Sequence, residues 1–184
     1  MNSRTCCKGV LATMRIIVSD SSCLIDLHKA RLHLDVLTLP FTFVVPQPLY
    51  DRELLSIPPR EREMMVARGM QVQRLTGEET QRAQDYANRF LPLAVYDCFA
   101  LVLAEVNDNS MLLTGDGNLR KVAEGHDVET HGVLWAVDQM EAHTEISVRV
   151  LLDALQLYEK DPMVWLPAAE LRRRIKALER RLYD

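Results

Sequence analysis

A short apolar run from Ser110 to Thr114 ends abruptly at Gly115-Asp116-Gly117, and a helix-like segment follows at once. An apolar run of this length is typical of a buried strand, and glycines are typical of the turn that follows one. An acid in that turn lies at the carboxyl edge of a sheet, where open α/β folds usually place their chemistry. The pattern therefore predicts a strand–turn–helix unit with Asp116 at that edge.

The same alternation of strand-like and helix-like segments runs through most of the chain. Apolar or alternating segments predict strands at 14–19, 41–45, 69–75, 110–114 and 127–130. Helix-like segments lie between these strands, and three more follow the last one, at 133–140, 146–158 and 168–182. Strands that alternate with helices indicate βαβ units, so we expect an α/β fold with a mostly parallel sheet flanked by helices.

Composition limits the class of protein. A chain of 184 residues with 48% hydrophobic residues is expected to form one domain with a real core. The net charge of −4 gives no reason from global charge to expect nucleic-acid binding, although a metal or a local basic face could supply the attraction. The four cysteines form no C-x-x-C pair and no zinc-type spacing, which suits a reducing cytoplasm. No apolar run is long enough to predict a membrane span.

Four acids lie at the ends or beginnings of these segments, and each has an ordinary explanation. Asp20 follows the first predicted strand and could be only a helix N-cap. Glu53 could be a solvated residue or a partner of Arg52, and Asp116 is equally at home in an ordinary turn. Asp97 is harder to explain, because its segment is too apolar to carry a charge without a helix N-terminus or a metal as partner.

Taken as a set, these acids predict a metal site. Parallel strands bring their carboxyl ends to one edge, so Asp20 and Asp116 should converge there, and Glu53 and Asp97 can reach it from helices. Clustered carboxylates repel each other, and Mg²⁺ or Mn²⁺ would relieve the repulsion, because hard cations prefer oxygen ligands. No His or Cys occupies these positions, which argues against zinc. Such a site suits phosphodiester hydrolysis by a metal-activated water.

The segments that carry the acids also occur in a characteristic order. They are Ile-Val-Ser-Asp-Ser-Ser-Cys-Leu-Ile-Asp-Leu (17–27), Val-Pro-Gln-Pro-Leu-Tyr-Asp-Arg-Glu-Leu (45–54), Tyr-Asp-Cys-Phe-Ala-Leu-Val-Leu-Ala (96–104) and Leu-Leu-Thr-Gly-Asp-Gly-Asn-Leu-Arg-Lys-Val-Ala (112–123). Together with Val-Glu-Thr-His-Gly-Val-Leu-Trp (128–135), they resemble the PIN-domain family, in particular the VapC-type ribonuclease toxins of bacterial toxin–antitoxin pairs. The resemblance covers roughly 15–140.

The resemblance implies a three-layer α/β/α sandwich around a parallel sheet, and a protein that is usually dimeric. By the same resemblance, Asp20, Glu53, Asp97 and Asp116 would be the catalytic, metal-coordinating acids, and Ser22 would orient one of them through its hydroxyl. The implied cofactor is Mg²⁺ or Mn²⁺. The implied partners are RNA and a cognate antitoxin protein, in the cytoplasm and away from any membrane.

The resemblance also suggests how the chain is divided. Residues 14–142 would form the PIN-like nuclease domain, and 143–184 would be a C-terminal helical extension packed on the same domain. Residues 1–13 precede a second methionine, Met14, and we expect them to be a disordered leader or the product of an upstream start codon.

Basic residues supply further candidates for substrate binding. Arg120 and Lys121 lie one turn beyond Asp116 and are well placed to touch RNA. The tail carries six basic residues in 172–181, which form either a solvated face of an amphipathic helix or a ridge that meets RNA phosphates or an acidic partner. No row of aromatic residues is apparent for stacking on bases. The five histidines are scattered along the sequence, and we expect none to be a metal ligand.

Two other hypotheses remain open at the level of sequence. The chain could be a non-catalytic PIN-like module that binds RNA or a protein through a degenerate site, although the presence of all four acids counts against it. A receiver-type phosphotransfer domain also collects acids at a sheet edge. It would need an acceptor Asp after the third strand and a late Lys, and no such pair is in register.

Overall fold

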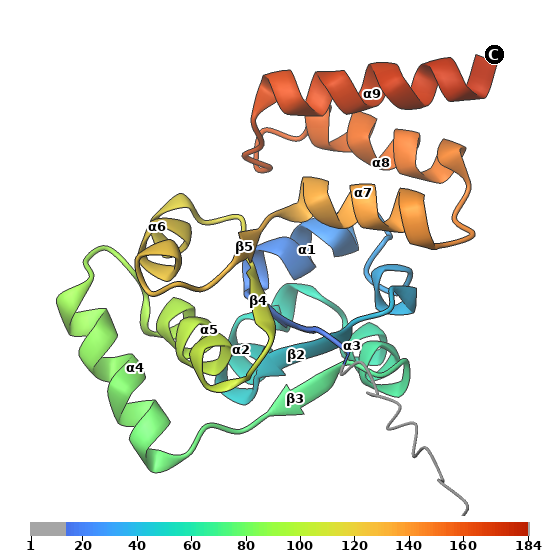
Figure 1. Ribbon diagram of the computed structural model, residues 1–184. Coiled ribbons are helices and arrows are strands. Elements are labelled where there is room, and N and C mark those ends of the chain that lie inside the picture. Colours follow the sequence, from blue (N-terminus) through green and yellow to red (C-terminus); the bar gives the residue numbers. More distant parts are fainter. Residues whose placement is uncertain (1–13, 184) are drawn as a thin grey trace, which may run out of the picture.

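In the computed structural model, which describes residues 14–183, five strands form one sheet in the order β3-β2-β1-β4-β5 (Figure 1). The strands are β1 (Ile16–Ser19), β2 (Thr42–Pro46), β3 (Gln71–Gln73), β4 (Ser110–Leu113) and β5 (Thr130–His131). Every neighbouring pair is parallel. The predicted α/β fold with helices around a parallel sheet is therefore confirmed. The predicted leader, 1–13, lies outside the described residues.

Helices connect the strands and extend the chain beyond the sheet. They are α1 (Ser21–Lys29), α2 (Gln47–Arg52), α3 (Pro59–Ala67), α4 (Gly77–Arg89), α5 (Val95–Val106), α6 (Gly117–Gly125), α7 (Val133–His143), α8 (Val148–Lys160) and α9 (Ala168–Tyr183). Two short 3₁₀ turns, η1 (Val36–Thr38) and η2 (Leu54–Ser56), interrupt the connections. None of the helices in this described part of the chain has the length and apolar character needed to cross a bilayer.

Helix α5 covers one face of the sheet. Seven consecutive residues, Cys98–Ala104, are buried, and the helix lies against β1, β2 and β4 with α4 on its outer side. Its nearly all-round apolar sequence explains this burial. Because parallel crossovers are right-handed, the β1–α1–β2 connection places α1 on the opposite face, where it contacts α7. The sheet thus lies between two helical layers (Figure 1).

The strand order creates a switch point beside the central strand. From β1 the chain proceeds to β2 and β3 on one side, and then returns through α4 and α5 to β4 on the other side. At the carboxyl ends of β1 and β4, the amide of Asp20 donates to the carbonyl of Leu113 at 3.0 Å. Open parallel sheets bind ligands in the crevice at such a switch point.

The C-terminal helices pack on the side of the sheet that carries α1. Helix α7 contacts both α1 and α8, and α8 packs along α9 (Figure 1). The hydroxyl of Tyr158, a buried residue of α8, donates to the carbonyl of Asp26 in α1 at 2.9 Å. Helix α9 buries Leu171, Ile175 and Leu178 at helical spacing. This packing is the amphipathic arrangement predicted for the tail.

The last strand differs from its predicted position. The sequence predicted a strand at 127–130, whereas β5 covers only Thr130–His131. The preceding residues close the end of α6 instead, since Asp127 has a left-handed φ of 59° and the amide of Val128 donates to the carbonyl of Ala123 at 2.9 Å. An apolar Val128 made this turn resemble a strand. The strand predicted at 69–75 is confirmed as the shorter β3, which lies at the edge of the sheet.

Candidate active site

Asp20 lies at the centre of the candidate site, at the carboxyl end of the central strand. Its side chain is only 2% exposed and caps α1 by accepting from the amide of Cys23 at 3.3 Å. The hydroxyl of Ser22 donates to the same oxygen, Oδ1, at 2.7 Å, and the hydroxyl of Thr114 donates to Oδ2. Burial raises the pKa of Asp20 to about 6, against these hydrogen bonds, which lower it. The residue is therefore both a helix cap and a firmly held carboxylate.

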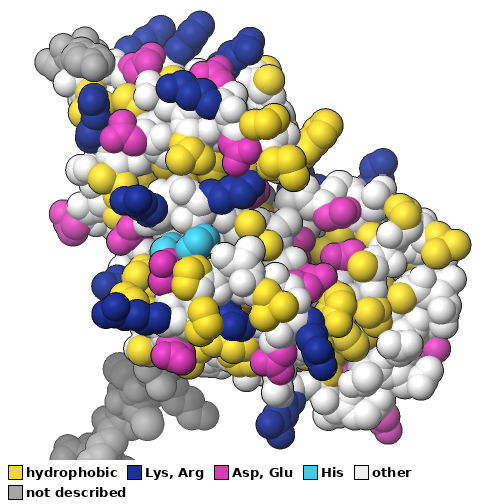
Figure 2. Space-filling model, turned by 180° about the vertical axis from the view of Figure 1, so that it is seen from behind, with side chains coloured by type: hydrophobic (Ala, Val, Ile, Leu, Met, Phe, Trp, Pro, Cys, Tyr) yellow, Lys and Arg dark blue, Asp and Glu magenta, His cyan; other side chains and the backbone are white. Residues whose placement is uncertain are grey.

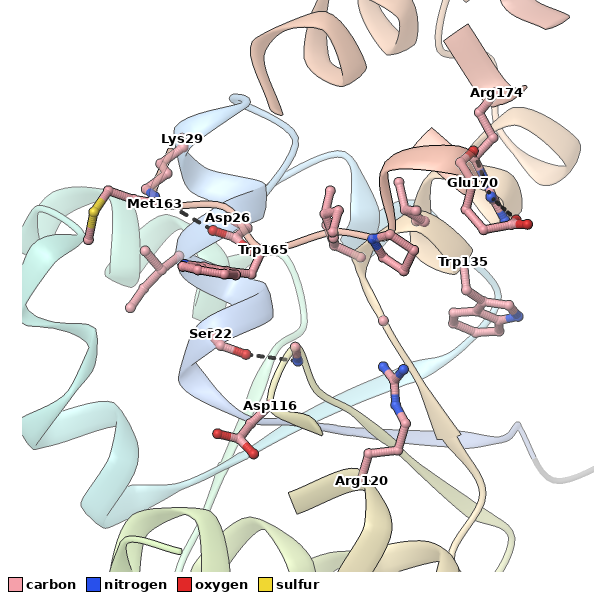
Figure 3. Close-up of a pocket in the computed structure, with 17 residues that line it drawn as sticks. Ser22, Asp26, Lys29, Asp116, Arg120, Trp135, Met163, Trp165, Glu170 and Arg174 are labelled. Carbon is pink, nitrogen blue, oxygen red and sulfur yellow. Dashed lines mark hydrogen bonds and ion pairs between the residues drawn. The ribbon is translucent and has the colours of Figure 1, made fainter. Parts of the chain in front are cut away.

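Ser22 joins the turn after β1 to the turn after β4. Its hydroxyl donates to Asp20 and accepts from the amide of Gly115 at 2.9 Å (Figure 3). A Cβ atom at Gly115 would lie 2.9 Å from that hydroxyl oxygen, so only glycine fits without displacing Ser22. This contact to Asp20 is the one that the predicted orienting role requires, and the role itself stays a prediction.

Asp116 follows β4 and faces the same edge. Its Oδ1 caps α6 by accepting from the amides of Asn118 at 2.6 Å and Leu119 at 2.8 Å. Its own amide donates to the hydroxyl of Thr114 at 3.0 Å, the same hydroxyl that donates to Asp20. Thr114, which is fully buried, thus fixes the position of both acids, a role that the sequence did not reveal.

Glu53 and Asp97 reach the edge from helices, as predicted. Glu53 caps the end of α2, and its Oε2 accepts from the hydroxyl of Ser21 in α1 at 2.6 Å. Asp97 lies in the first turn of α5, and its Oδ2 accepts from the amide of Ala94 at 2.8 Å. Burial, together with the negative charges of Asp116 and Glu53, raises the pKa of Asp97. The charge of Asp97 acts on Asp20, and those of Asp116 and Glu53 act on Asp97, so the four acids lie near one another at the carboxyl end of the sheet.

Three of these acids have one anchored oxygen and one open oxygen. The anchored oxygens are Oε2 of Glu53, Oδ2 of Asp97 and Oδ1 of Asp116, which accept the hydrogen bonds just described. Within residues 14–183, the second oxygen of each accepts no hydrogen bond, and no Lys, Arg or His forms an ion pair with any of the four carboxylates. Outer hydrogen bonds of this kind orient the ligands of metal sites.

The spacing of the carboxylates limits how an ion could be held. Among the described residues, the one group of three ligand atoms that lies within 4.8 Å is elsewhere, so no three of the four acids bring their oxygens that close together. Mg²⁺ and Mn²⁺ suit such a wider spacing, because Mg²⁺ keeps several waters and often takes only one or two carboxylates directly. The all-oxygen donor set also fits these ions and does not favour zinc.

A cavity of about 600 Å³ opens beside the acids (Figure 3). Ser22 and Asp116 line it on the side of the site, and Trp135 and Trp165 line it on the side of the C-terminal helices. Trp165 lies in the loop between α8 and α9 and is 87% exposed. Figure 2 shows acidic side chains close together on one face of the molecule, with hydrophobic side chains around them.

The aromatic residues of this cavity were missed from the sequence. Trp135 and Trp165 are far from the acids along the chain, and neither belongs to an aromatic row. Trp135 is partly used within the fold, since it stacks on His131 with ring centroids 4.1 Å apart. Trp165 has no such ring partner among the described residues, so its exposed face is available to a ligand.

The predicted basic contacts are only partly near this cavity. Arg120 lines it and donates through Nη2 to the carbonyl of Thr114 at 2.9 Å, whereas the exposed Lys121 does not line it. In the tail, most arginines are paired within the protein; the ion pairs are Arg172–Glu159, Arg173–Glu170, Arg174–Asp138 and Arg181–Glu141. A basic ridge on α9 is therefore largely neutralised by its own neighbours.

Comparison with known proteins identifies the family of the chain. Residues 16–180 match the model of DUF3368, which is described as a PIN domain. The chain belongs to the PIN-domain family. PIN domains are generally metal-dependent nucleases, and the match extends through most of α9. No curated protein matches the chain.

A solved structure supports the fold of this PIN domain. It is that of a PilT N-terminus domain protein, SSO1118, from the hyperthermophilic archaeon Sulfolobus solfataricus P2. The two chains superpose with a TM-score of 0.50 at 15% sequence identity, over 73% of this chain and 99% of the other. At this identity the likeness concerns the fold alone.

Proposed function

We propose that this PIN domain is a Mg²⁺- or Mn²⁺-dependent endoribonuclease. The observation that carries the proposal is the second oxygen of each of Glu53, Asp97 and Asp116, which accepts no hydrogen bond among residues 14–183, together with the lack of any ion pair to these acids or to Asp20 there. Uncompensated carboxylates at this spacing repel one another, and a bound divalent cation would offset the repulsion. The bound ion supplies an activated water and stabilises charge on the phosphodiester oxygens.

The protein's own residues would organise the reaction. Asp20, Glu53, Asp97 and Asp116 hold the ion, and Ser22 and Thr114 keep Asp20 ionised and correctly oriented through their hydroxyls. The cavity would receive the part of the RNA strand next to the scissile phosphate. Arg120 lies at its wall and contributes positive charge.

The substrate proposal is single-stranded RNA. Proteins bind single strands by stacking exposed bases on aromatic side chains, and Trp165 offers an exposed indole at the edge of the cavity. Arg120 is the basic residue nearest to Asp116 along α6 that lines this cavity. Lys121, which is exposed outside the cavity, would contact the RNA strand beyond it. The resemblance to VapC-type proteins supports a role as the toxin of a toxin–antitoxin pair, dimeric and cytoplasmic, with an antitoxin protein as partner.

Cleavage of a mixed RNA pool tests this proposal. Wild-type protein should cut RNA in Mn²⁺ and not in EDTA. Asp97→Asn should lower the rate by more than about 100-fold, which exceeds the usual effect of losing a residue that only hydrogen-bonds to a metal ligand. The matched control is Asp108→Asn, the same change at an exposed position in the loop before β4. Equal cleavage by both variants would refute the acid site.

The competing hypothesis is a non-catalytic module that binds RNA or protein. It predicts that the folded protein binds neither Mn²⁺ nor Mg²⁺ in calorimetry and cuts no RNA under any metal condition. The anchored oxygens favour the enzyme, because each of the three acids is held by one oxygen and keeps its second oxygen for an ion.

A further inference from the structure

A second group of potential ligands lies away from the acids, where α1 ends. His28 is in the last turn of α1, His33 follows that helix, and Glu61 is in the first turn of α3. One ligand atom from each lies within 4.8 Å of the other two. Since Asp20 caps the other end of α1, roughly 12 Å of helix separates the two sites.

The three side chains already contact one another. His28 Nε2 lies 2.9 Å from Glu61 Oε2, and His33 Nε2 lies 3.1 Å from the same oxygen. The two imidazole rings meet edge to face with centroids 4.8 Å apart. The edge of a tetrahedron around zinc is about 3.3 Å for bonds of about 2.0 Å, so small shifts would bring all three atoms to bonding positions.

Hydrogen bonding within this group does not account for the buried ring of His33. Its side chain is only 8% exposed, yet neither ring nitrogen has a hydrogen bond of good geometry within the part of the chain that the structure describes. Nε2 has only the Glu61 oxygen at 3.1 Å as an ion-pair contact, and Nδ1 has no partner of either kind among residues 14–183. Buried polar groups are almost always paired, and an unpaired one calls for a bound water or ion. Burial also lowers the pKa of His33, which keeps the ring neutral and able to donate a lone pair.

We propose that His28, His33 and Glu61 form a zinc site. Two imidazole nitrogens and one carboxylate oxygen are the ligand types that zinc binds at three positions, with water at the fourth. The side chains of His28 and Glu61 are partly exposed, which gives the ion and that water a path from solvent. The same nitrogen-rich set does not suit Mg²⁺, so this site and the acid site select different ions.

The position of the site indicates a structural role. The ion joins the end of α1 to α3, two segments that are 33 residues apart, and it lies away from the carboxyl ends of the strands. Binding to the folded state alone stabilises that state, because the three ligands are not held together in the unfolded chain. The proposal does not depend on the nuclease function.

Zinc titration of the metal-free protein tests the site. The starting protein carries Cys6→Ser and Cys7→Ser, because these thiols could bind zinc on their own. We expect one zinc per chain in calorimetry and a rise of about 5 °C or more in the unfolding midpoint at saturating zinc. His33→Gln and Glu61→Gln should each weaken zinc binding by at least about tenfold and abolish the rise.

Two controls separate this site from other effects. His143→Gln changes an exposed histidine outside the group and should keep the zinc-induced rise, and Asp97→Asn should keep it as well. Each variant is compared with its own metal-free melt; if His33→Gln does not fold, the partly exposed His28→Gln replaces it. An unchanged rise in the ligand variants, or no saturable binding by the starting protein, would overturn the proposal.

Discussion

At the scale of single residues, the site depends on how hydroxyls hold acids. Ser22 and Thr114 donate to the two oxygens of Asp20, and Ser21 donates to Glu53. The Asp-Ser-Ser sequence after β1 therefore has a physical reason, because its two consecutive serines donate hydrogen bonds to two different carboxylates. A buried carboxyl group without such donors would be protonated at ordinary pH and would bind a cation poorly.

The pKa of Asp20 makes the stability of the metal-free protein depend on pH. It is about 6 in the folded state, above its ordinary value of 3.8, so between these values the folded chain binds more protons than the unfolded chain. Stability should therefore fall by up to about 3 kcal/mol as pH rises from about 4 to about 6. Urea unfolding in EDTA checks this, and Asp20→Asn should lose the decrease.

The comparison between the two proteins isolates Asp20 from other groups that titrate in this range. Parallel stability curves for wild type and Asp20→Asn across pH 4–6 would show that Asp20 is not protonated there. Excess Mn²⁺ should reverse the loss in wild type at higher pH, because the ion binds the charged carboxylate.

Gly115 offers a second test at this scale. Gly115→Ala pushes a methyl group against the Ser22 hydroxyl, so we expect Mn²⁺ affinity to fall by about 10- to 100-fold and stability to fall by about 1–3 kcal/mol. Gly117→Ala is the matched control, because a Cβ there meets nothing within 4 Å. Calorimetry and urea unfolding measure both effects. Equal Mn²⁺ affinities for the two variants would contradict the role of Ser22.

At the scale of elements, the loop between α8 and α9 is the part of the C-terminal region that lies next to the candidate site. It places Trp165 beside a cavity that Asp116 and Arg120 also line. The C-terminal helices thus contribute to the candidate site through this loop, whereas the sequence predicted that they pack on the domain and offered RNA contact only through the basic face of the last helix. The division into a domain at 14–142 and a C-terminal helical extension at 143–184 stays a prediction.

Trp165 should contribute to RNA binding rather than to chemistry. Loss of one base-stacking contact costs about 1–3 kcal/mol, so Trp165→Ala should raise the KM for RNA by about tenfold and leave kcat nearly unchanged. Trp165→Phe keeps a stacking ring and should retain most of the affinity. Steady-state cleavage of a short single-stranded RNA separates the two parameters. An equal KM for both variants and wild type would exclude a stacking role.

At the scale of the whole molecule, the sequence was sufficient for the fold class and for the edge that carries the acids. The apolar runs that end at Asp20 and Asp116 are local signals, and the parallel arrangement follows from their alternation with helices. The proximity of Trp165 to Asp116, and of His33 to Glu61, could not be predicted, because each depends on packing between distant segments. The short β5 was misplaced because a buried turn residue, Val128, resembles a strand residue.

Mn²⁺ binding tests the central claim most directly, since the account requires the four acids to hold a divalent ion. Calorimetry is performed on the His33→Gln protein, which removes the second group of ligands, and on the same protein carrying Asp97→Asn or Asp108→Asn. The account predicts saturable Mn²⁺ binding that Asp97→Asn weakens by at least about tenfold and Asp108→Asn leaves unchanged. No binding, or equal binding by all three proteins, would contradict it.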